Sequence, residues 1–314
     1  MLLAVQLSTI EHLAQWLGFE HAYQFRAILS VLLVTAICGM VGALVVGNRM
    51  AFFSDAMAHC AFAGVALGVL VTLTLGSPKE QESLRWIVPL IMVGFGALVG
   101  LAIAFVRERT ELASDTVIGV FFAGAIGFGA MLLSALKQRK AIDPETFLFG
   151  SPLYVQDVDF LYLTILFMLT IATILWRSNH LLLASFNPSL ARSRRVSIRL
   201  NNYLFIVLLA LIVNLSIVTV GALLINAMLV VPAATATNLS RNLRQMFWIT
   251  LGTSILSGLA GLYLAASFQM RIGSGEAVEF GPSGTIICVA VLLFFLSMIV
   301  PSLVRRKAVA RPAT

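Results

Sequence analysis

Long apolar runs are the feature that most constrains this chain. A helix needs about 20 mainly apolar residues to cross the hydrocarbon core of a bilayer, and the 314 residues contain nine runs of about that length. They extend over Ala27 to Gly47, Ala51 to Gly76, Trp86 to Val106, Thr116 to Leu136, Asp159 to Trp176, Tyr203 to Thr219, Val220 to Asn238, Met246 to Phe268 and Pro282 to Val304. We therefore predict an all-α fold, a polytopic transmembrane bundle of about 8–10 helices.

Composition agrees with this prediction. Hydrophobic residues make up 60% of the chain and charged residues only 11%, which is more apolar surface than a soluble domain of this length can bury. The stretch from Tyr203 to Asn238 is almost unbroken, and we divide it around Thr219 to Gly221 because its length fits two crossings.

The basic residues indicate an orientation in the membrane. They are not gathered on a soluble face with aromatic residues, so the net charge of +7 does not indicate a nucleic-acid partner. With residues 305–314 as a basic cytoplasmic tail, four Lys and Arg residues of the tail and ten of the loops lie inside, 14 of 21. The positive-inside rule favours this orientation. The outer side then carries 7 basic and 10 acidic residues, a formal charge of −3, which would attract cations.

Three regions follow along the chain. Residues 1–25 lack the pattern of a removable signal peptide and are predicted to form an interfacial segment. Residues 26–304 form the transmembrane domain, and the basic tail follows. Cys38, Cys60 and Cys288 have no paired spacing, so we interpret them as small buried apolar residues. The absence of a GxxxxGK[ST] motif indicates that any ATP is bound by another subunit.

Two polar stretches interrupt the spans. Gln138 to Val158 is predicted to lie outside, either as a docking surface for an extracytoplasmic partner or as a plain connection. Arg177 to Asn202 is predicted to be cytoplasmic, with Asn187 and Pro188 able to start a helix at Ser189. Its arginines either anchor the neighbouring helices at lipid headgroups or belong to a surface helix that presses into a partner.

One ionisable pair within an apolar run points to function. Asp55 and His59 are the only Asp, Glu, Lys, Arg or His residues between Arg49 and Lys79, and ionisable groups at bilayer depth are costly. Their spacing places both side chains on one helix face, one turn apart. A carboxylate with an imidazole suits zinc, manganese or iron. The pair supplies two ligands only, so a full shell needs water, another helix or a symmetry mate.

A structural interpretation stays open for this pair and for a later segment. Asp55 is also suited to the N-terminal end of a helix, with His59 as its hydrogen-bonded neighbour. Asn226, Met228 and Pro232 lie in or near a span, where Pro232 frees a backbone carbonyl. They either line a pathway or accompany a simple kink.

Several segments together resemble the membrane-subunit family of metal-ion ABC transporters, which import zinc, manganese or iron. The resemblance rests on RMAFFSDAMAHCAFAGVALG, SDTVIGVFFAGAIGFGAMLLS, FLFGS, ASFNPSLARS, VGALLINAMLVVPAATATNLS and GPSGTIICVAVLLFFLS. They occur in family order, and the first and fifth are the specific ones.

The resemblance implies a homodimeric permease, related in architecture to the vitamin B12 and siderophore permeases, in a prokaryotic inner membrane. Its partners would be a cytoplasmic ABC ATPase and an extracytoplasmic metal-binding protein; it would itself be no enzyme and hold no permanent cofactor. Asp55 and His59 would coordinate the ion in transit. A coupling helix at about 183–199 would meet the ATPase through Phe186, Pro188, Ala191, Arg194 and Arg195. Arg194 and Arg195 stand where the family usually has a glycine.

Three other functions remain to be separated from metal-ion import. A permease for a chelated metal or a corrinoid would need no ionic ligand pair. A proton-coupled secondary transporter would use Asp55 and His59 as a proton relay. An intramembrane metalloenzyme is disfavoured because there is no HExxH motif. The sequence does not choose among zinc, manganese and iron.

Overall fold

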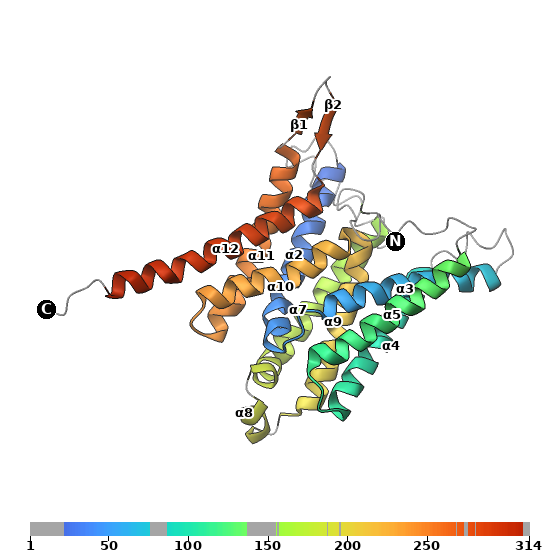
Figure 1. Ribbon diagram of the computed structural model, residues 1–314, viewed down its shortest axis with the longest axis horizontal. Coiled ribbons are helices and arrows are strands. Elements are labelled where there is room, and N and C mark those ends of the chain that lie inside the picture. The colour runs from blue at the N-terminus through green and yellow to red at the C-terminus, as the bar shows by residue number, and fades with distance from the viewer. Residues whose placement is uncertain are drawn as a thin grey trace. The chain divides into compact units, whose positions relative to one another are not determined.

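The computed structural model describes residues 22–75, 87–136, 155, 157–186, 188–194, 196–267, 269–272, 276–279 and 281–309. Its elements are α2 (Ala22–Gly47), α3 (Phe53–Leu75), α4 (Ile87–Arg109), α5 (Ser114–Leu136), α7 (Asp157–Phe186), α8 (Pro188–Ser193), α9 (Ile198–Val220), α10 (Ala222–Leu239), α11 (Leu243–Ser267), β1 (Gln269–Ile272), β2 (Glu276–Glu279) and α12 (Pro282–Val309) (Figure 1).

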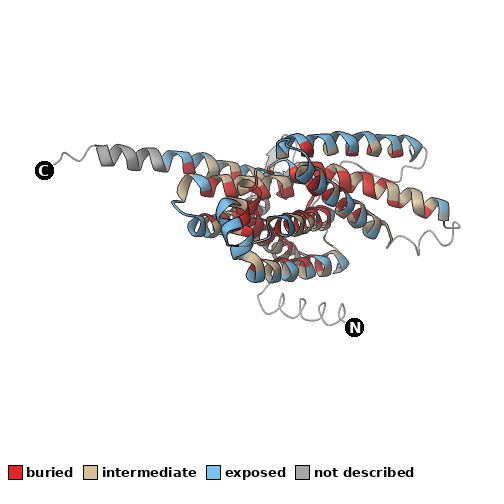
Figure 2. Ribbon diagram, turned by 90° about the horizontal axis from the view of Figure 1, so that it is seen from below, coloured by how far each residue is buried: buried red, intermediate tan, exposed pale blue. Residues whose placement is uncertain are grey.

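Nine helices within the described residues are long and apolar enough to cross a membrane, which confirms the predicted helical bundle. The division near Gly221 is also confirmed: α9 ends at Val220, and Gly221 adopts a φ of 87° before α10 begins. A small antiparallel hairpin of β1 and β2 follows α11. Exposed residues alternate with buried ones along α4, α5, α7, α11 and α12, whereas α2 has no exposed side chain among its described residues (Figure 2). An exposed side is expected where a spanning helix faces lipid.

Contacts divide the chain into two compact units. The first contains residues 1–46, 151–167 and 223–314, with α2, α10, α11 and α12 among its described elements. Ser254 of α11 donates a hydrogen bond to the carbonyl of Thr35 in α2 at 2.7 Å. Asn238 of α10 donates to Ser297 of α12 at 3.0 Å. These bonds satisfy polar side chains away from water and tie the helices together.

The second unit contains residues 47–150 and 168–222. Here α3 packs against α4, α5 and α9, and α4 also packs against α9; Figure 1 shows α3, α4 and α5 running side by side. A Cβ on Gly64 of α3 would lie 2.9 Å from the Cα of Met92 in α4. Only glycine permits this approach of two helix backbones.

Four expectations are corrected or lie wholly or partly outside the described residues. Cys38 and Cys60 are buried, but Cys288 is exposed on α12, where an apolar side chain can face lipid without cost. The interfacial segment is described only from residue 22, and most of the polar stretch before α7 lies outside the described residues. Of the basic tail, the helix is described as far as Val309, without its side chains.

Candidate metal-ion site

A tight linker places the ionisable pair at the start of α3. Arg49 adopts a φ of 54°, a left-handed conformation that turns the chain between α2 and α3. Met50 is fully buried, and its sulfur accepts a hydrogen bond from Arg107 Nη1 of α4 at 3.2 Å. Its carbonyl accepts a hydrogen bond from the Phe53 backbone N–H at 3.1 Å. The arginine and methionine of the sequence motif therefore set where α3 begins.

Asp55 and His59 lie in the first two turns of α3. Both are half-buried, while Ala56, Met57 and Cys60 between and beside them are fully buried. Asp55 and His59 therefore lie on the same side of α3, and both are less buried than the residues around them. Asp55 lies in the first turn, where a carboxylate also interacts favourably with the helix dipole. The dipole accounts for Asp55 but not for His59 one turn deeper.

An aromatic residue holds the histidine ring. His59 meets Phe122 of α5 edge to face, with ring centroids 4.9 Å apart and an interplanar angle of 86°. Edge-to-face contacts of this kind favour one ring orientation. Sequence reasoning did not find Phe122, because no local pattern relates it to His59.

The described residues offer only part of the ligand shell that a metal ion would need. No group of three or more His, Cys, Asp and Glu side chains that could hold a metal occurs among the described residues. Asp55 and His59 therefore offer one carboxylate and one imidazole, and water or a second copy would complete the shell.

The pathway candidates occupy α10 in the other unit. Met228 is fully buried and Pro232 is buried; the Ser257 hydroxyl lies 3.9 Å from the Met228 sulfur. The Thr253 hydroxyl lies 3.4 Å from the Pro232 carbonyl. These contacts agree with packing at a proline kink, and Asn226 is half-buried. A pathway role for the three residues stays a prediction.

The predicted coupling helix is shorter than expected. Instead of one helix over 183–199, α7 continues to Phe186, α8 covers Pro188–Ser193 and α9 begins at Ile198, with Ser197 capping it by accepting the Leu200 N–H. Serine favours such N-cap positions and so divides the segment. Ala191 is fully buried and Arg194 is exposed; the Pro188 side chain and Arg195 lie outside the described residues.

The linker before α3 is joined to the end of α7. Asn48 Nδ2 donates to Ser185 Oγ at 2.7 Å, and Ser185 donates in turn to the Leu181 carbonyl at 2.8 Å. A Cβ on Gly47 would lie 2.8 Å from Cε2 of Phe186, so the Phe186 ring rests directly on the Gly47 backbone. The segment that carries Asp55 and His59 is therefore in contact with the residues that lead into α8.

Comparison with known proteins decides the family. The model of the ABC 3 transport family matches residues 20–301. The chain belongs to this family of ABC transporter permeases. It is accordingly a multi-pass protein of a prokaryotic inner membrane, with nine candidate spans in its described part.

Proteins with similar sequences are named as components of metal transport systems. The permease is 28% identical over 260 residues to the manganese transport system membrane protein MntC of Halalkalibacterium halodurans, covering 81% of this chain and 82% of the relative. It is 28% identical over 275 residues to the high-affinity zinc uptake system membrane protein ZnuB of Haemophilus influenzae, covering 87% and 96%.

A solved structure agrees with the fold. PsaBC from Streptococcus pneumoniae in complex with Fab matches with a TM-score of 0.69 and 25% identity, covering 93% of the permease and 95% of that chain.

Proposed function

We propose that this permease is the membrane-spanning subunit of an ATP-driven importer for a divalent transition-metal cation, namely zinc, manganese or iron, and that Asp55 and His59 bind the ion in transit. The observation that carries the proposal is the half-buried carboxylate and imidazole one turn apart in an apolar span. Membership in the ABC 3 transport family and the manganese and zinc names of similar proteins support it.

The pair suits transient binding. A carboxylate and an imidazole replace part of the hydration shell of a borderline metal, and an ion that must leave again cannot be held in a closed cage. In a homodimer, two copies would offer two carboxylates and two imidazoles. The metal is cargo here, not a resident cofactor.

ATP would act from a separate subunit. The permease catalyses no covalent step and would move the ion by alternating access, with α8 and the flanking arginines meeting the ATPase and an extracytoplasmic binding protein delivering the ion. On the predicted orientation the start of α3 lies toward the cytoplasm. The pair would then receive the ion in the inner half of the span.

The energy source tests this proposal against its main rival. In vesicles containing the permease and its copurified ATPase, we expect metal uptake to require ATP and to persist when a protonophore collapses the proton gradient. Uptake that follows the proton gradient and needs no ATPase would identify a secondary transporter instead. Uptake of a chelate but not of the free ion would indicate a chelate permease.

The contact between the α3 linker and α7 provides a second prediction. Because a hydrogen bond such as this partly buried one contributes about 1 kcal/mol, Asn48→Ala is expected to lower ATP-driven uptake about fivefold, while ATP hydrolysis by the complex continues. Ser185→Ala should give a similar loss, and the double variant should be no worse than either, since both substitutions remove the same bond between Asn48 and Ser185. Uptake and hydrolysis are measured in the same vesicles.

Ser134→Ala is the matched control. Its hydroxyl bonds only within its own helix, to the Met131 carbonyl at 2.7 Å, so uptake should be unchanged. Additive losses in the Asn48 and Ser185 variants, or equal loss of hydrolysis and uptake, would show that the contact does not couple the two segments.

A further inference from the structure

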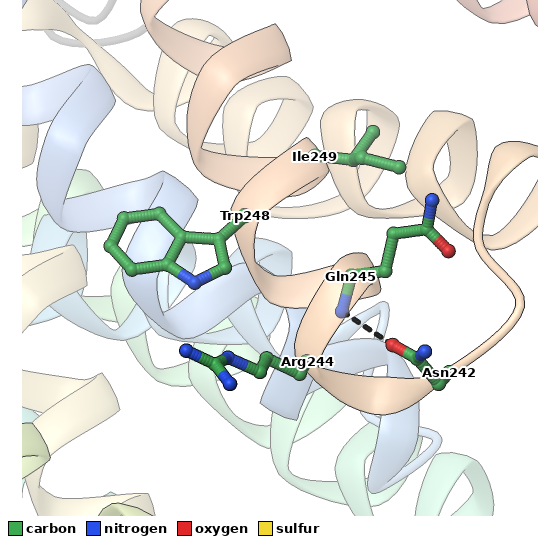
Figure 3. A pocket seen from close by; sticks show the side chains of 5 residues that line it. All are labelled: Asn242, Arg244, Gln245, Trp248 and Ile249. Atoms are coloured by element: carbon green, nitrogen blue, oxygen red, sulfur yellow. Dashed lines mark hydrogen bonds between the residues drawn. The ribbon is translucent and has the colours of Figure 1, made fainter.

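An open hollow lies at the start of α11, away from the ionisable pair in sequence and in a different unit. It has a volume of about 460 Å³ and is lined by Asn242, Arg244, Gln245, Trp248 and Ile249. Figure 3 shows Arg244 and Trp248 extending to the same side of α11. Nothing in the transport mechanism above uses these residues.

Two side-chain hydrogen bonds cap the start of this helix. Asn242 Oδ1 accepts the Gln245 backbone N–H at 2.8 Å, and Gln245 Oε1 accepts the Arg241 backbone N–H at 3.0 Å. This pairing resembles a capping box, except that Gln245 accepts the N–H of the residue before the N-cap. Both amide oxygens are thereby engaged, so the polar groups that these two side chains can offer to a ligand are their NH₂ donors.

The lining changes from cationic to apolar along the helix. Arg244 follows the first residue of the candidate span Leu243–Ser267, and Trp248 and Ile249 lie about 6–8 Å deeper at 1.5 Å per residue. Trp248 is 59% exposed. An exposed tryptophan at this depth of a membrane-spanning helix meets the interface between headgroups and acyl chains.

The surrounding sequence offers no acidic partner. No Asp or Glu occurs between Asp159 and Glu276, whereas Arg241 and Arg244 are both exposed at this turn. On the predicted orientation they lie on the cytoplasmic side, where the membrane surface carries anionic lipid. The charge of the hollow therefore complements an anion.

We propose that this hollow binds the headgroup of an anionic phospholipid. The Arg244 guanidinium takes the phosphodiester, and Trp248, on the same side of α11, holds the glycerol and the first acyl carbons. A free phosphate would use only the polar half of this lining. This proposal requires that the permease spans a membrane, which its family membership shows. It does not require that Asp55 and His59 bind the transported ion.

Native mass spectrometry of the permease with its copurified ATPase tests the site. The probes are phosphatidylglycerol, phosphatidylcholine of the same chain length, and glycerol 3-phosphate as the free anion. We expect Arg244→Gln and Trp248→Ala each to weaken phosphatidylglycerol binding about fivefold. Phosphatidylcholine should bind equally to the wild type and to Arg244→Gln, and glycerol 3-phosphate should not displace the lipid.

Arg241→Gln is the matched control, since it removes the same charge from the same turn but does not line the hollow. Its phosphatidylglycerol affinity should stay near that of the wild type. Equal losses in Arg241→Gln and Arg244→Gln would reveal a diffuse basic surface and overturn the proposal, as would displacement by glycerol 3-phosphate. If Arg244→Gln does not fold, Trp248 fluorescence of the wild type is measured with brominated phosphatidylglycerol, and Trp248→Phe serves as the reference. The proposal predicts that this lipid quenches the Trp248 fluorescence. Equal quenching by brominated phosphatidylcholine would refute the site.

Discussion

Metal uptake by the assembled complex is expected to fall at least about 100-fold when Asp55 is changed to Asn or His59 to Gln. Asparagine keeps the shape of Asp55 and glutamine keeps approximately the length of His59, and each substitution removes a metal ligand of the required basicity. Because the described part of one chain offers only these two donors at the site, loss of either leaves too few to replace the hydration shell. Initial uptake of radiolabelled ion into vesicles, at equal protein content, measures the effect.

Two control substitutions separate ligand loss from other effects. Asp115 is exposed and lies in the first turn of α5, so Asp115→Asn removes a carboxylate with the same favourable helix-dipole interaction. His180 is exposed on α7, and His180→Gln matches the histidine change. Both should transport normally. Wild-type uptake by Asp55→Asn and His59→Gln would show that these two side chains do not bind the transported ion. An equal loss in Asp115→Asn would show that the effect is not specific to them.

The largest expected loss of stability comes from a glycine where α11 meets α12. A Cβ on Gly261 would contact the Cα of Ile286, with Ile286 Cγ1 at 2.7 Å and the backbone nitrogen at 2.9 Å. Backbone atoms cannot rotate away, so Gly261→Ala forces the two helices apart. Overpacking of this kind costs about 1–3 kcal/mol.

Gly252→Ala on the same helix is the control for Gly261→Ala, because nothing lies within 4 Å of the Cβ it would add. It should leave the melting temperature unchanged or raise it, since alanine is favoured over glycine in helices by about 1 kcal/mol. Thermal unfolding of both variants in the same detergent measures the difference. Equal melting temperatures would show that α11 and α12 do not pack as described.

The sequence determines the spans well because hydrophobic length is a local property. Every predicted run corresponds to a helix that can cross a membrane, and even the break at Gly221 follows from length. Helix ends were harder to predict. Nothing in the polar sequence after Trp176 shows that α7 continues to Phe186, or that the Ser197 cap separates α8 from α9.

Contacts between helices could not be predicted from the sequence. Asp55 and His59 could be proposed as a pair because a spacing of four residues places two side chains on one helix face. The ring that His59 contacts edge to face belongs to Phe122 of α5, which the sequence did not indicate. Asn48 and Ser185 are 137 residues apart and still form a hydrogen bond. Such partners depend on how whole helices pack, and no local pattern encodes them. The hairpin after α11 was likewise not predicted, because its strands are only four residues long.

Anomalous diffraction from crystals of the permease–ATPase complex, soaked with manganese and measured at its absorption edge, tests most directly whether the two side chains share one ion. We predict a manganese peak at bonding distance, about 2.0–2.3 Å, from a carboxylate oxygen of Asp55 and a ring nitrogen of His59. The peak should vanish in His59→Gln crystals of the same form. A transported ion bound elsewhere in the permease, with no peak between these two residues, would contradict the account.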